Sequence, residues 1–401
     1  MKKIKNQVPA VVFGLFETGL GIIRSLGMNG IPVYGIDHKK DIAWYSRYVR
    51  PMKCPNPAND AQLTAWLKEQ FKGFSDKLPV FISSDDFLSY FSRNRNELAE
   101  LFIIDIPSSN LIQVLSDKYE QFKLACKVGV AVPNTWFIKN PQDKEAFHGQ
   151  NLNYPLFLKG MDVNTWRQHF GGTKKGFVLN NKNELTSRLQ RLDPLATPVV
   201  IQELVEGPDT AHYKYSAYID EEGKTLAEFM LQKIRQYPIH FGVGAAVKSI
   251  YDEELLSTGR KLFKGINYRG VGSAEFKWDA KNNSFSLIEL NPRYWQQNYL
   301  ATFCGLNFPL IQYHNLVEKT KNRKISYDED RFWINRYMDF SAYVEYRKED
   351  GLTLRQWRKS IKGKRVYSDF LWKDPVPMLY EFDFGRKLFK MPGYIIKKLL
   401  H

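Results

Sequence analysis

Cysteine is scarce in this chain, and long apolar runs are missing. Its 401 residues include only Cys54, Cys126 and Cys304, with no CxxC pair among them. An odd number of cysteines at unrelated spacings argues against a disulfide framework or a zinc site. No stretch approaches the roughly 18 uninterrupted apolar residues of a transmembrane helix. The basic segment 1–9 has no signal-peptide core behind it, so we expect a soluble protein in the cytoplasm.

The composition is that of a folded protein with a basic C-terminal part. Hydrophobic residues make up 43% of the chain, which suffices for two or three domains with sizeable cores. The formal net charge is +15, and residues 321–401 contain 19 Lys or Arg against 11 Asp or Glu. Polyanions, anionic lipid surfaces and acidic substrates are therefore candidate partners, although charge alone specifies neither fold nor chemistry.

The first part of the chain alternates strands and helices. Val8 to Asp37 reads as a βαβ unit, with a strand at 10–13, helical spacing at 19–27 and a second strand at 31–36. A helix at 61–71 and strands at 79–82 and 101–105 continue the alternation. This order predicts a parallel sheet of the α/β class.

The pattern changes near Pro107, where we place the first domain boundary. Ser116 is a candidate N-cap for a helix that ends at Lys127, before Gly129. Short strands then alternate with polar loops, which predicts antiparallel α+β structure. The expected domains are 1–115, 116–320 with a subdomain at about 135–200, and a basic, aromatic region at 321–401. In that last region, aromatic residues such as Trp333 are expected on helices and loops.

The strongest local signal is a predicted hairpin between Gly272 and Arg293. Two apolar strands flank a turn at 281–283, so any register centred on the turn brings Glu275 opposite or diagonal to Glu289 and Asn291. Facing carboxylates destabilise a sheet unless a cation neutralises them, and carboxylate and amide oxygens suit Mg²⁺. The alternative is a solvated sheet face. Arg293, just after the strand, would place a fixed guanidinium beside a transferred phosphoryl group.

Two further segments give weaker signals. A buried-looking strand delivers Lys159 to a loop that contains Gly171, Gly172 and Gly176, and such a loop can hold phosphate oxygens through its backbone N–H groups. An ordinary exposed hairpin is the commoner explanation. The segment Val199 to Asp209 runs from a β-branched strand into a turn. Its backbone could contact an adenine edge and Asp209 could accept from ribose hydroxyls, but a strand that runs into a turn is the commoner explanation.

Taken in order, these segments resemble the ATP-grasp superfamily, which includes biotin carboxylase and the D-alanine:D-alanine ligases. The resemblance covers roughly Pro9 to Leu310 and is strongest toward carboxylate-amine ligases, through GLFETGLGIIRSLGMNGIPVYGID and SDKYEQFKLACKVGVAVPNT. It implies an ATP-grasp fold in which a Rossmann-like parallel sheet precedes the nucleotide-binding domain and a mobile lid subdomain.

The resemblance also implies nucleotide ligands. Lys118 and Lys159 would contact ATP phosphates, and the loop with Gly171 and Gly172 would close over them. The adenine and ribose ligands would be Gln202, Glu203, Val205 and Asp209.

The remaining implied residues surround the reacting groups. Lys233 and Arg235 would face the phosphates or the acyl substrate. Glu275, Glu289 and Asn291 match the magnesium ligands, with Mn²⁺ as the alternative ion, and Arg293 matches the arginine after them. The implied reaction is transfer of the γ-phosphoryl group to a carboxylate, followed by attack of an amine on the acyl phosphate.

Other hypotheses remain open at this stage. An ATP-grasp enzyme could use a non-amine acceptor, or the chain could be a membrane- or nucleic-acid-binding protein with a vestigial nucleotide site. The latter is disfavoured by the retained acidic set, and we expect no nucleic-acid partner. An NAD site is also disfavoured because Gly14, Gly19 and Gly21 have the wrong spacing and Glu17 would lie near the pyrophosphate.

The end of the chain allows two interpretations. Residues 385–401 contain five basic and no acidic residues among leucines and isoleucines. Such a segment could contact an anionic bilayer at the inner membrane surface, or it could be a terminal helix packed on the body. A homodimer is also left open.

Overall fold

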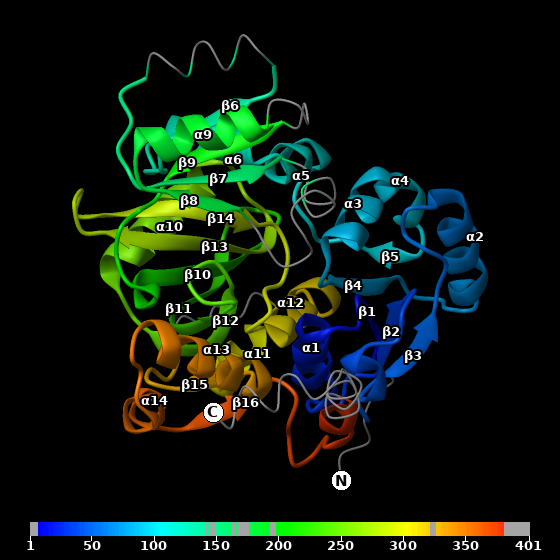
Figure 1. The fold of residues 1–401 in the computed structure, drawn as a ribbon. Coiled ribbons are helices and arrows are strands. Elements are labelled where there is room, and N and C mark those ends of the chain that lie inside the picture. Colours follow the sequence, from blue (N-terminus) through cyan, green and yellow to red (C-terminus); the bar gives the residue numbers. More distant parts are fainter. Residues whose placement is uncertain are drawn as a thin grey trace.

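The computed structural model describes residues 7–140, 143, 147, 150–161, 166, 176–192, 198–320 and 326–380. Three sheets account for their strands, and Figure 1 shows how the helices surround these sheets. Among the described residues, no helix has both the length and the apolar character needed to span a bilayer.

The first sheet is parallel, as the alternation of strands and helices predicts. Its strand order is β3-β2-β1-β4-β5, and each neighbouring pair is parallel. The elements are β1 (Ala10–Phe13), α1 (Glu17–Gly27), β2 (Val33–Asp37), η1 (Ile42–Tyr45), β3 (Arg50–Lys53), α2 (Asp60–Phe71), β4 (Leu78–Ile82), α3 (Asp85–Arg93), α4 (Arg95–Leu98) and β5 (Phe102–Ile103). The expected strands and helices of this part are confirmed to within a few residues, and η1, β3, α3 and α4 are additions.

At the turn after β1, the two carboxylates of the apparent dinucleotide fingerprint, Glu17 and Asp37, are engaged by other groups of the protein. Glu17 begins α1 and points its carboxylate at side chains of the central domain, where Gln296 and Asn335 donate to it. Burial raises the pKa of Glu17. Asp37, the other half of the apparent fingerprint, accepts a hydrogen bond from the Leu15 backbone at 2.7 Å. Both carboxylates are therefore committed to holding this turn.

Two helices lead from the first sheet to the rest of the chain. They are α5 (Ser109–Ser116) and α6 (Lys118–Lys127). The expected cap at Ser116 is wrong by one residue, because the Asp117 carboxylate accepts from the Tyr119 and Glu120 backbones. Ser116 instead ends the preceding helix and donates to the Ile112 carbonyl at 2.8 Å.

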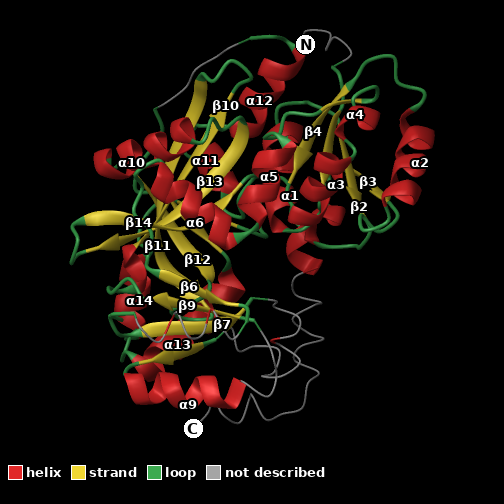
Figure 2. Cartoon of the chain, turned by 90° about the horizontal axis from the view of Figure 1, so that it is seen from above, coloured by secondary structure: helices red, strands yellow, loops and turns green. Residues whose placement is uncertain are grey.

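A small antiparallel sheet follows, which we call the lid sheet. Its strand order is β6-β9-β7-β8. The elements are β6 (Thr135–Ile138), β7 (Leu156–Gly160), β8 (Phe177–Leu179), α9 (Lys182–Leu192) and β9 (Val199–Glu203). Their apolar faces form a separate core that includes Leu158, Leu185 and Ile201. Figures 1 and 2 show this sheet and α9 at one end of the molecule, away from the parallel sheet.

The central sheet has seven strands in the order β14-β13-β10-β11-β12-β15-β16. Its elements and flanking helices are η3 (Asp209–Ala211), β10 (His212–Ile219), β11 (Thr225–Tyr237), β12 (Val243–Ile250), α10 (Glu253–Gly265), β13 (Gly270–Asp279), β14 (Ser284–Asn291), α11 (Asn298–Phe303), α12 (Phe308–Val317), β15 (Phe332–Ile334), α13 (Arg336–Glu349), α14 (Leu354–Ser360) and β16 (Arg365–Tyr367). The expectation of only helices and loops after residue 321 is wrong: Trp333 lies in β15, which pairs with β12.

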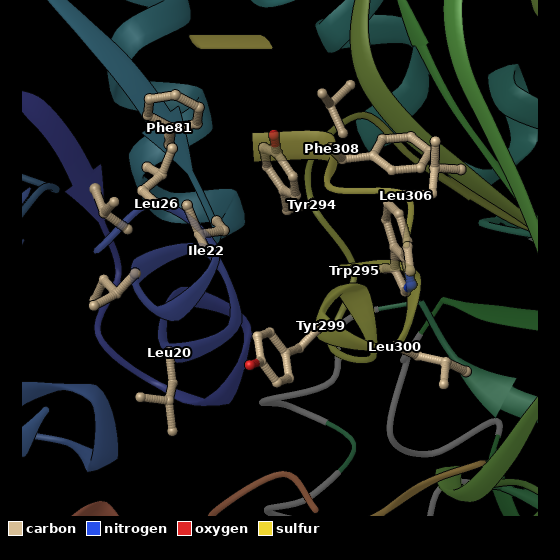
Figure 3. Close-up of a cluster of buried hydrophobic side chains, with 14 of the residues drawn as sticks. Leu20, Ile22, Leu26, Phe81, Tyr294, Trp295, Tyr299, Leu300, Leu306 and Phe308 are labelled. Carbon is tan, nitrogen blue, oxygen red and sulfur yellow. The ribbon is translucent and has the colours of Figure 1, made fainter. Parts of the chain in front are cut away.

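One hydrophobic core joins the parallel sheet to the central sheet. Helix α1 contributes Leu20, Ile22 and Leu26, and the segment after β14 contributes Trp295 and Leu300. Figure 3 shows these two groups facing each other. Trp295 is 1% exposed and packs edge-on against Phe308. Because close-packed cores deform little, the two sheets form one rigid wall of the cleft described below.

A buried ion pair ties the C-terminal part to this wall. Arg24 of α1 donates from Nε to the Asp374 carboxylate at 2.9 Å, and the two side chains are 1% and 0% exposed. The remaining guanidinium N–H groups donate to the carbonyls of Ser368, Asp369 and Asp374. The second Asp374 oxygen accepts from the Arg47 backbone at 2.9 Å. Each guanidinium nitrogen and each carboxylate oxygen of this pair thus has a hydrogen-bond partner within the protein.

Replacing Arg24 with Met should destabilise the fold strongly. The substitution leaves the Asp374 carboxylate buried without its counter-ion, which typically costs about 3–5 kcal/mol. Urea unfolding followed by tryptophan fluorescence measures the loss. Lys68→Met removes an exposed ion pair with Glu97 and serves as the control, with a far smaller expected change. Equal effects of the two substitutions would contradict the anchoring role of Arg24.

Candidate active site

Charged side chains gather on one face of the central sheet. Glu275 of β13 lies directly opposite Glu289 of β14 and, on its other side, opposite Lys214 of β10. The residues beside it, Ala274 and Phe276, point to the other face and are fully buried in the core. The alternation of side chains along a strand therefore collects polar groups on one face only.

Glu275 is surrounded by cations. Lys233 of β11 donates to its carboxylate, the Nδ1 atom of His212 lies 3.4 Å away and the Nζ atom of Lys214 lies 4.0 Å away. Burial by itself would raise the pKa of Glu275, but Lys233, His212 and Lys214 hold that pKa well below its ordinary value. Burial lowers the pKa of Lys214 and of His212. Glu275 is thus a charged, buried carboxylate that depends on its neighbours.

Glu289 is more accessible, with a side chain 41% exposed. The Nζ atom of Lys118, the first residue of α6, lies 3.3 Å from its carboxylate. Asn291 donates to the same group at 3.4 Å. Burial opposes ionisation here too, but Lys118 brings the pKa of Glu289 below its ordinary value.

A β-bulge shapes the strand that holds Glu289. The register shifts after Glu275, so that Phe276 pairs with Leu287 and Ile288 has no partner opposite. As a result, the adjacent residues Ile288 and Glu289 both line the same cavity. Bulges re-aim side chains in this way beside functional sites.

This charged face forms the floor of a cavity of about 590 Å³. Residues of the lid sheet, the central sheet and the turn after β1 line it. Among the predicted site residues, those in the lining are Lys118, Lys159, Gln202, Glu203, Val205, Lys233, Glu275, Glu289, Asn291 and Arg293. Predicted site residues up to 175 positions apart in the sequence, from Lys118 to Arg293, thus meet around one space.

The lid side of the cavity combines an apolar wall with polar groups that are already hydrogen-bonded within the protein. Phe157 of β7 stacks on Phe241, with ring centroids 4.6 Å apart and an interplanar angle of 16°. The Glu203 carboxylate accepts from the backbone and side chain of Asn153 at 2.9 and 3.1 Å. The backbone N–H groups of Glu203 and Leu204 also donate within the protein. Glu203 therefore shapes this wall instead of offering a charge to a ligand.

Arg293 lies at the opposite wall. Its guanidinium forms a two-pronged ion pair with Asp85 at the start of α3, with distances of 2.6 and 2.7 Å. Asp85 is 65% exposed on its side chain, so this pair sits at the cavity edge. An anion bound beside Arg293 would compete with Asp85 for the same donors.

Two predicted residues lie away from this cavity. Arg235 points to the opposite side of β11, where Asp339 accepts from its Nε atom at 2.7 Å and where it also donates to Ser360. Asp209 accepts from the His240 backbone at 2.9 Å and from the Tyr346 hydroxyl. Neither residue belongs to the cavity lining, and each side chain is engaged by other groups of the protein. Gly171 and Gly172 lie outside the described residues.

Three further side chains line the cavity that no sequence motif predicts: the lysines Lys214 and Lys277, and His212, whose pKa is lowered by burial. His212 and Lys214 are two residues apart on β10, and Lys277 lies two residues after Glu275 on β13. The signal was present as polar residues at every second position of otherwise aromatic strands. It went unrecognised because neither strand contains a motif by itself.

The oxygen donors of Glu275, Glu289 and Asn291 suit a magnesium ion that arrives with phosphate groups. Mg²⁺ usually takes one or two protein carboxylates and completes its shell with water and phosphate oxygens. In the described part of the chain there is no group of three or more His, Cys, Asp or Glu side chains arranged for a metal. The donor set therefore fits shared coordination better than a metal cage made by the protein alone.

Solved structures of other proteins share this architecture. The ADP complex of an N5-carboxyaminoimidazole ribonucleotide synthetase matches with a TM-score of 0.61 and 15% identity, over 88% of this chain and 87% of that one. An L-amino acid ligase from Bacillus licheniformis matches with a TM-score of 0.57 and 13% identity, over 78% and 75% of the two chains. The chain has the ATP-grasp fold, as the resemblance implies.

Comparison with curated proteins finds distant sequence relatives. The chain is 22% identical over 296 residues to a D-aspartate ligase from Enterococcus faecium (strain Aus0004), which covers 71% of this chain and 70% of that protein. It is 25% identical over 200 residues to pyruvate carboxylase from Aspergillus terreus, where the match spans 16% of the larger protein. No protein-family model matches the chain.

Replacing Lys233 with Met should change how stability depends on pH. Glu275 stays charged in the folded protein at pH values where it is protonated in the unfolded chain. Its contribution is therefore complete above the ordinary pKa of 4.5 and is lost as the pH falls through the lower folded-state pKa. The variant loses the nearest cation, so the pKa of Glu275 rises. The variant should be less stable than the wild type above pH 4.5, and the difference should shrink in more acidic solution.

Urea unfolding between about pH 3 and about pH 7 measures this difference. Lys248→Met, which removes an ion pair with the exposed Asp330, is the matched control. A stability loss in Lys233→Met that stays constant over the whole range would contradict the account of Glu275.

Proposed function

We propose that this chain is an ATP-dependent ligase that joins a carboxylate to an amine through an acyl phosphate. The observation that supports this most directly is the pairing of Glu275 with Glu289 beside a cavity lined by lysines from five elements. Paired carboxylates with cations around them suit the handling of a magnesium-bound triphosphate. The names of the structural and sequence relatives point the same way, because they include a D-aspartate ligase and an L-amino acid ligase.

The cavity residues divide the proposed reaction between them. Phe157, Val205 and Ile288 would hold the adenine between apolar surfaces, and Lys118 and Lys159 would neutralise phosphate charge. Glu275, Glu289 and Asn291 would share a magnesium ion, which supplies positive charge to the β- and γ-phosphate oxygens when bound. Lys233 and Lys214 are then placed to stabilise charge on the equatorial oxygens of the transferred group.

In the first step a substrate carboxylate oxygen attacks the γ-phosphorus, and the bond to the β-phosphate oxygen breaks to release ADP. In the second step an amine attacks the acyl carbon, phosphate leaves, and the amine proton passes to solvent or to the leaving phosphate. Neither step needs a covalent bond to the enzyme. Positioning and charge stabilisation supply the catalysis, which agrees with the lack of a Ser-His or Cys-His pair among the residues that line the cavity.

The far end of the cavity suits the non-nucleotide substrates. Thr18, Trp295 and Gln297 line it, and within the described chain the Nε1 atom of Trp295 and the Oε1 atom of Gln297 are buried without a hydrogen-bond partner. A buried polar atom that lacks a partner is costly, so a polar ligand at this end would gain from both atoms. One donor and one acceptor among the lining residues suit a small molecule with both kinds of group.

Glu289→Gln should abolish turnover without unfolding the protein. The substitution removes a negative charge that would bind metal in the transition state but keeps the size of the side chain, and we expect ADP release to fall by about 100-fold or more. A coupled assay of ADP release measures it, with circular dichroism as the check on folding. Glu206→Gln, an exposed residue nearby, is the control and should keep full activity.

The substrate pair for this assay comes from a screen of pooled amino acids, small carboxylates and amines, followed by mass spectrometry of the product. ADP release that requires both an acid and an amine, with formation of an amide, supports the proposal. Full activity of Glu289→Gln would contradict the metal site. ADP release with an acid alone, or with a hydroxyl acceptor, would contradict amide formation.

A further inference from the structure

A stretch of surface at the C-terminal side of the central sheet has cations but no accessible carboxylate. Between residues 354 and 379, seven Lys or Arg side chains are exposed: Arg355, Arg358, Lys359, Lys362, Lys364, Arg365 and Lys373. The same stretch contains two acidic residues, and both are buried. Asp369 pairs with Arg336, and Asp374 pairs with Arg24. No carboxylate within this stretch is exposed, and the neighbouring exposed Asp330 is paired with Lys248.

Large apolar side chains project from the same stretch. Trp372 is 87% exposed, Leu379 59% and Val376 45%. The Trp372 ring contacts only the edge of Phe370 among the ring pairs of the described chain, with centroids 4.9 Å apart. A tryptophan this exposed is unusual on a folded surface, because leaving the large apolar area of its ring in water costs free energy.

The backbone that presents Trp372 is held firmly. Asp374, two residues later, is the buried partner of Arg24 and also accepts from the Ser46 hydroxyl at 2.8 Å. A bridge between Leu371 and Asp374 closes the turn around the tryptophan. The ring is therefore displayed on an anchored turn, and its exposure does not come from a loose end.

Cations of the first domain lie beside this turn. Tyr45 stacks on Tyr380 with centroids 4.8 Å apart, and the Tyr380 hydroxyl donates to the Lys40 carbonyl at 3.3 Å. Lys39, Lys40 and Arg47 are exposed there, whereas the nearby Asp41 is half-buried and caps η1. We define the basic face as the exposed cations of residues 354–373 together with Lys39, Lys40, Arg47 and Trp372.

We propose that the basic face binds an anionic lipid bilayer surface. Each Lys or Arg near such a surface strengthens binding by about fivefold, and the effect sums over several side chains. Tryptophan favours the boundary between headgroups and acyl chains, where an apolar ring with one polar N–H is best solvated. The cations thus match the anionic headgroups, and the exposed tryptophan and aliphatic side chains match the apolar boundary beneath them.

Two other occupants fit the same surface less well. A nucleic acid would use the cations but would leave Leu379 and Val376 in contact with a charged backbone. A second copy of this chain would bring two positive faces together, which costs free energy. Figure 1 shows α14, β16 and the segment after it along the edge of the molecule opposite the lid sheet and α9. A bilayer on this edge would leave the lid side of the cavity accessible.

The test is sedimentation of the full chain with vesicles. Vesicles of phosphatidylglycerol and phosphatidylcholine should bind the protein, and those of phosphatidylcholine alone should bind it weakly. Added salt should weaken the binding steeply. The triple variant Arg358→Glu, Lys362→Glu, Lys364→Glu should lose about 100-fold or more in partition coefficient. Trp372→Ala should lose several-fold in a way that salt does not change.

A matched control separates this face from net charge. The triple variant Lys68→Glu, Lys72→Glu, Lys77→Glu makes the same change in charge on and beside α2, at the edge of the first domain, and should bind vesicles like the wild type. Equal loss in both triple variants would overturn the proposal. So would absence of binding to anionic vesicles, tight binding to duplex DNA but not to vesicles, or a dimer in ultracentrifugation that the first triple variant dissociates.

Removal of residues 385–401 tests whether the terminal segment, and not the basic face, binds the vesicles. If truncation abolishes vesicle binding while the triple variant of the basic face leaves it unchanged, the contact belongs to the terminal segment and the proposal fails. Binding that survives truncation and is lost in the triple variant supports it. These outcomes do not depend on the proposed ligase activity, since vesicle binding needs no substrate.

Discussion

Two glutamates occupy directly opposed positions on neighbouring strands, and the architecture around the cavity depends on keeping them charged. In an isolated hairpin Glu275 and Glu289 would repel each other and loosen the pair of strands. Here Lys214, Lys233 and His212 on the next two strands, and Lys118 at the start of α6, offset that repulsion. The order β14-β13-β10-β11 is therefore an electrostatic requirement as well as a topological one.

In the proposed reaction, the same interaction would let the site accept a divalent cation. A carboxylate that is charged only because lysines surround it can exchange those lysines for a metal ion, while the lysines turn to phosphate oxygens. The rigid wall supports this exchange, because the core shared by α1 and Trp295 and the buried Arg24–Asp374 pair hold three parts of the chain in one geometry. The lid sheet has its own core and contacts this wall through the Phe157–Phe241 stack, so it can move as a unit.

Local patterns were enough to predict the elements that determine the site. The hairpin from Gly272 to Arg293 was predictable because strand alternation and a turn of Lys and Asn residues specify which side chains share a face. Its bulge was not, because the skipped partner of Ile288 depends on packing across the sheet. The position of Arg235 could not be predicted for a similar reason. In a regular strand it would share a face with Lys233, two residues earlier, but register shifts between Lys233 and Gln236 turn it toward Asp339 on α13. Trp333 was assigned to the wrong kind of element because a three-residue strand gives no periodicity to read.

The central claim, that Glu275 and Glu289 hold a divalent ion against a nucleotide's phosphates, is tested most directly by magnetic resonance with Mn²⁺ as the probe. Pulsed electron-nuclear measurements on the protein with Mn²⁺ and ADP report phosphorus nuclei bonded through oxygen to the ion, and protein carboxylates displace part of its water shell. The account predicts strong phosphorus coupling in the wild type, together with fewer bound waters than in Mn²⁺-ADP alone. A spectrum identical to that of free Mn²⁺-ADP, at concentrations where the nucleotide is bound, would contradict it.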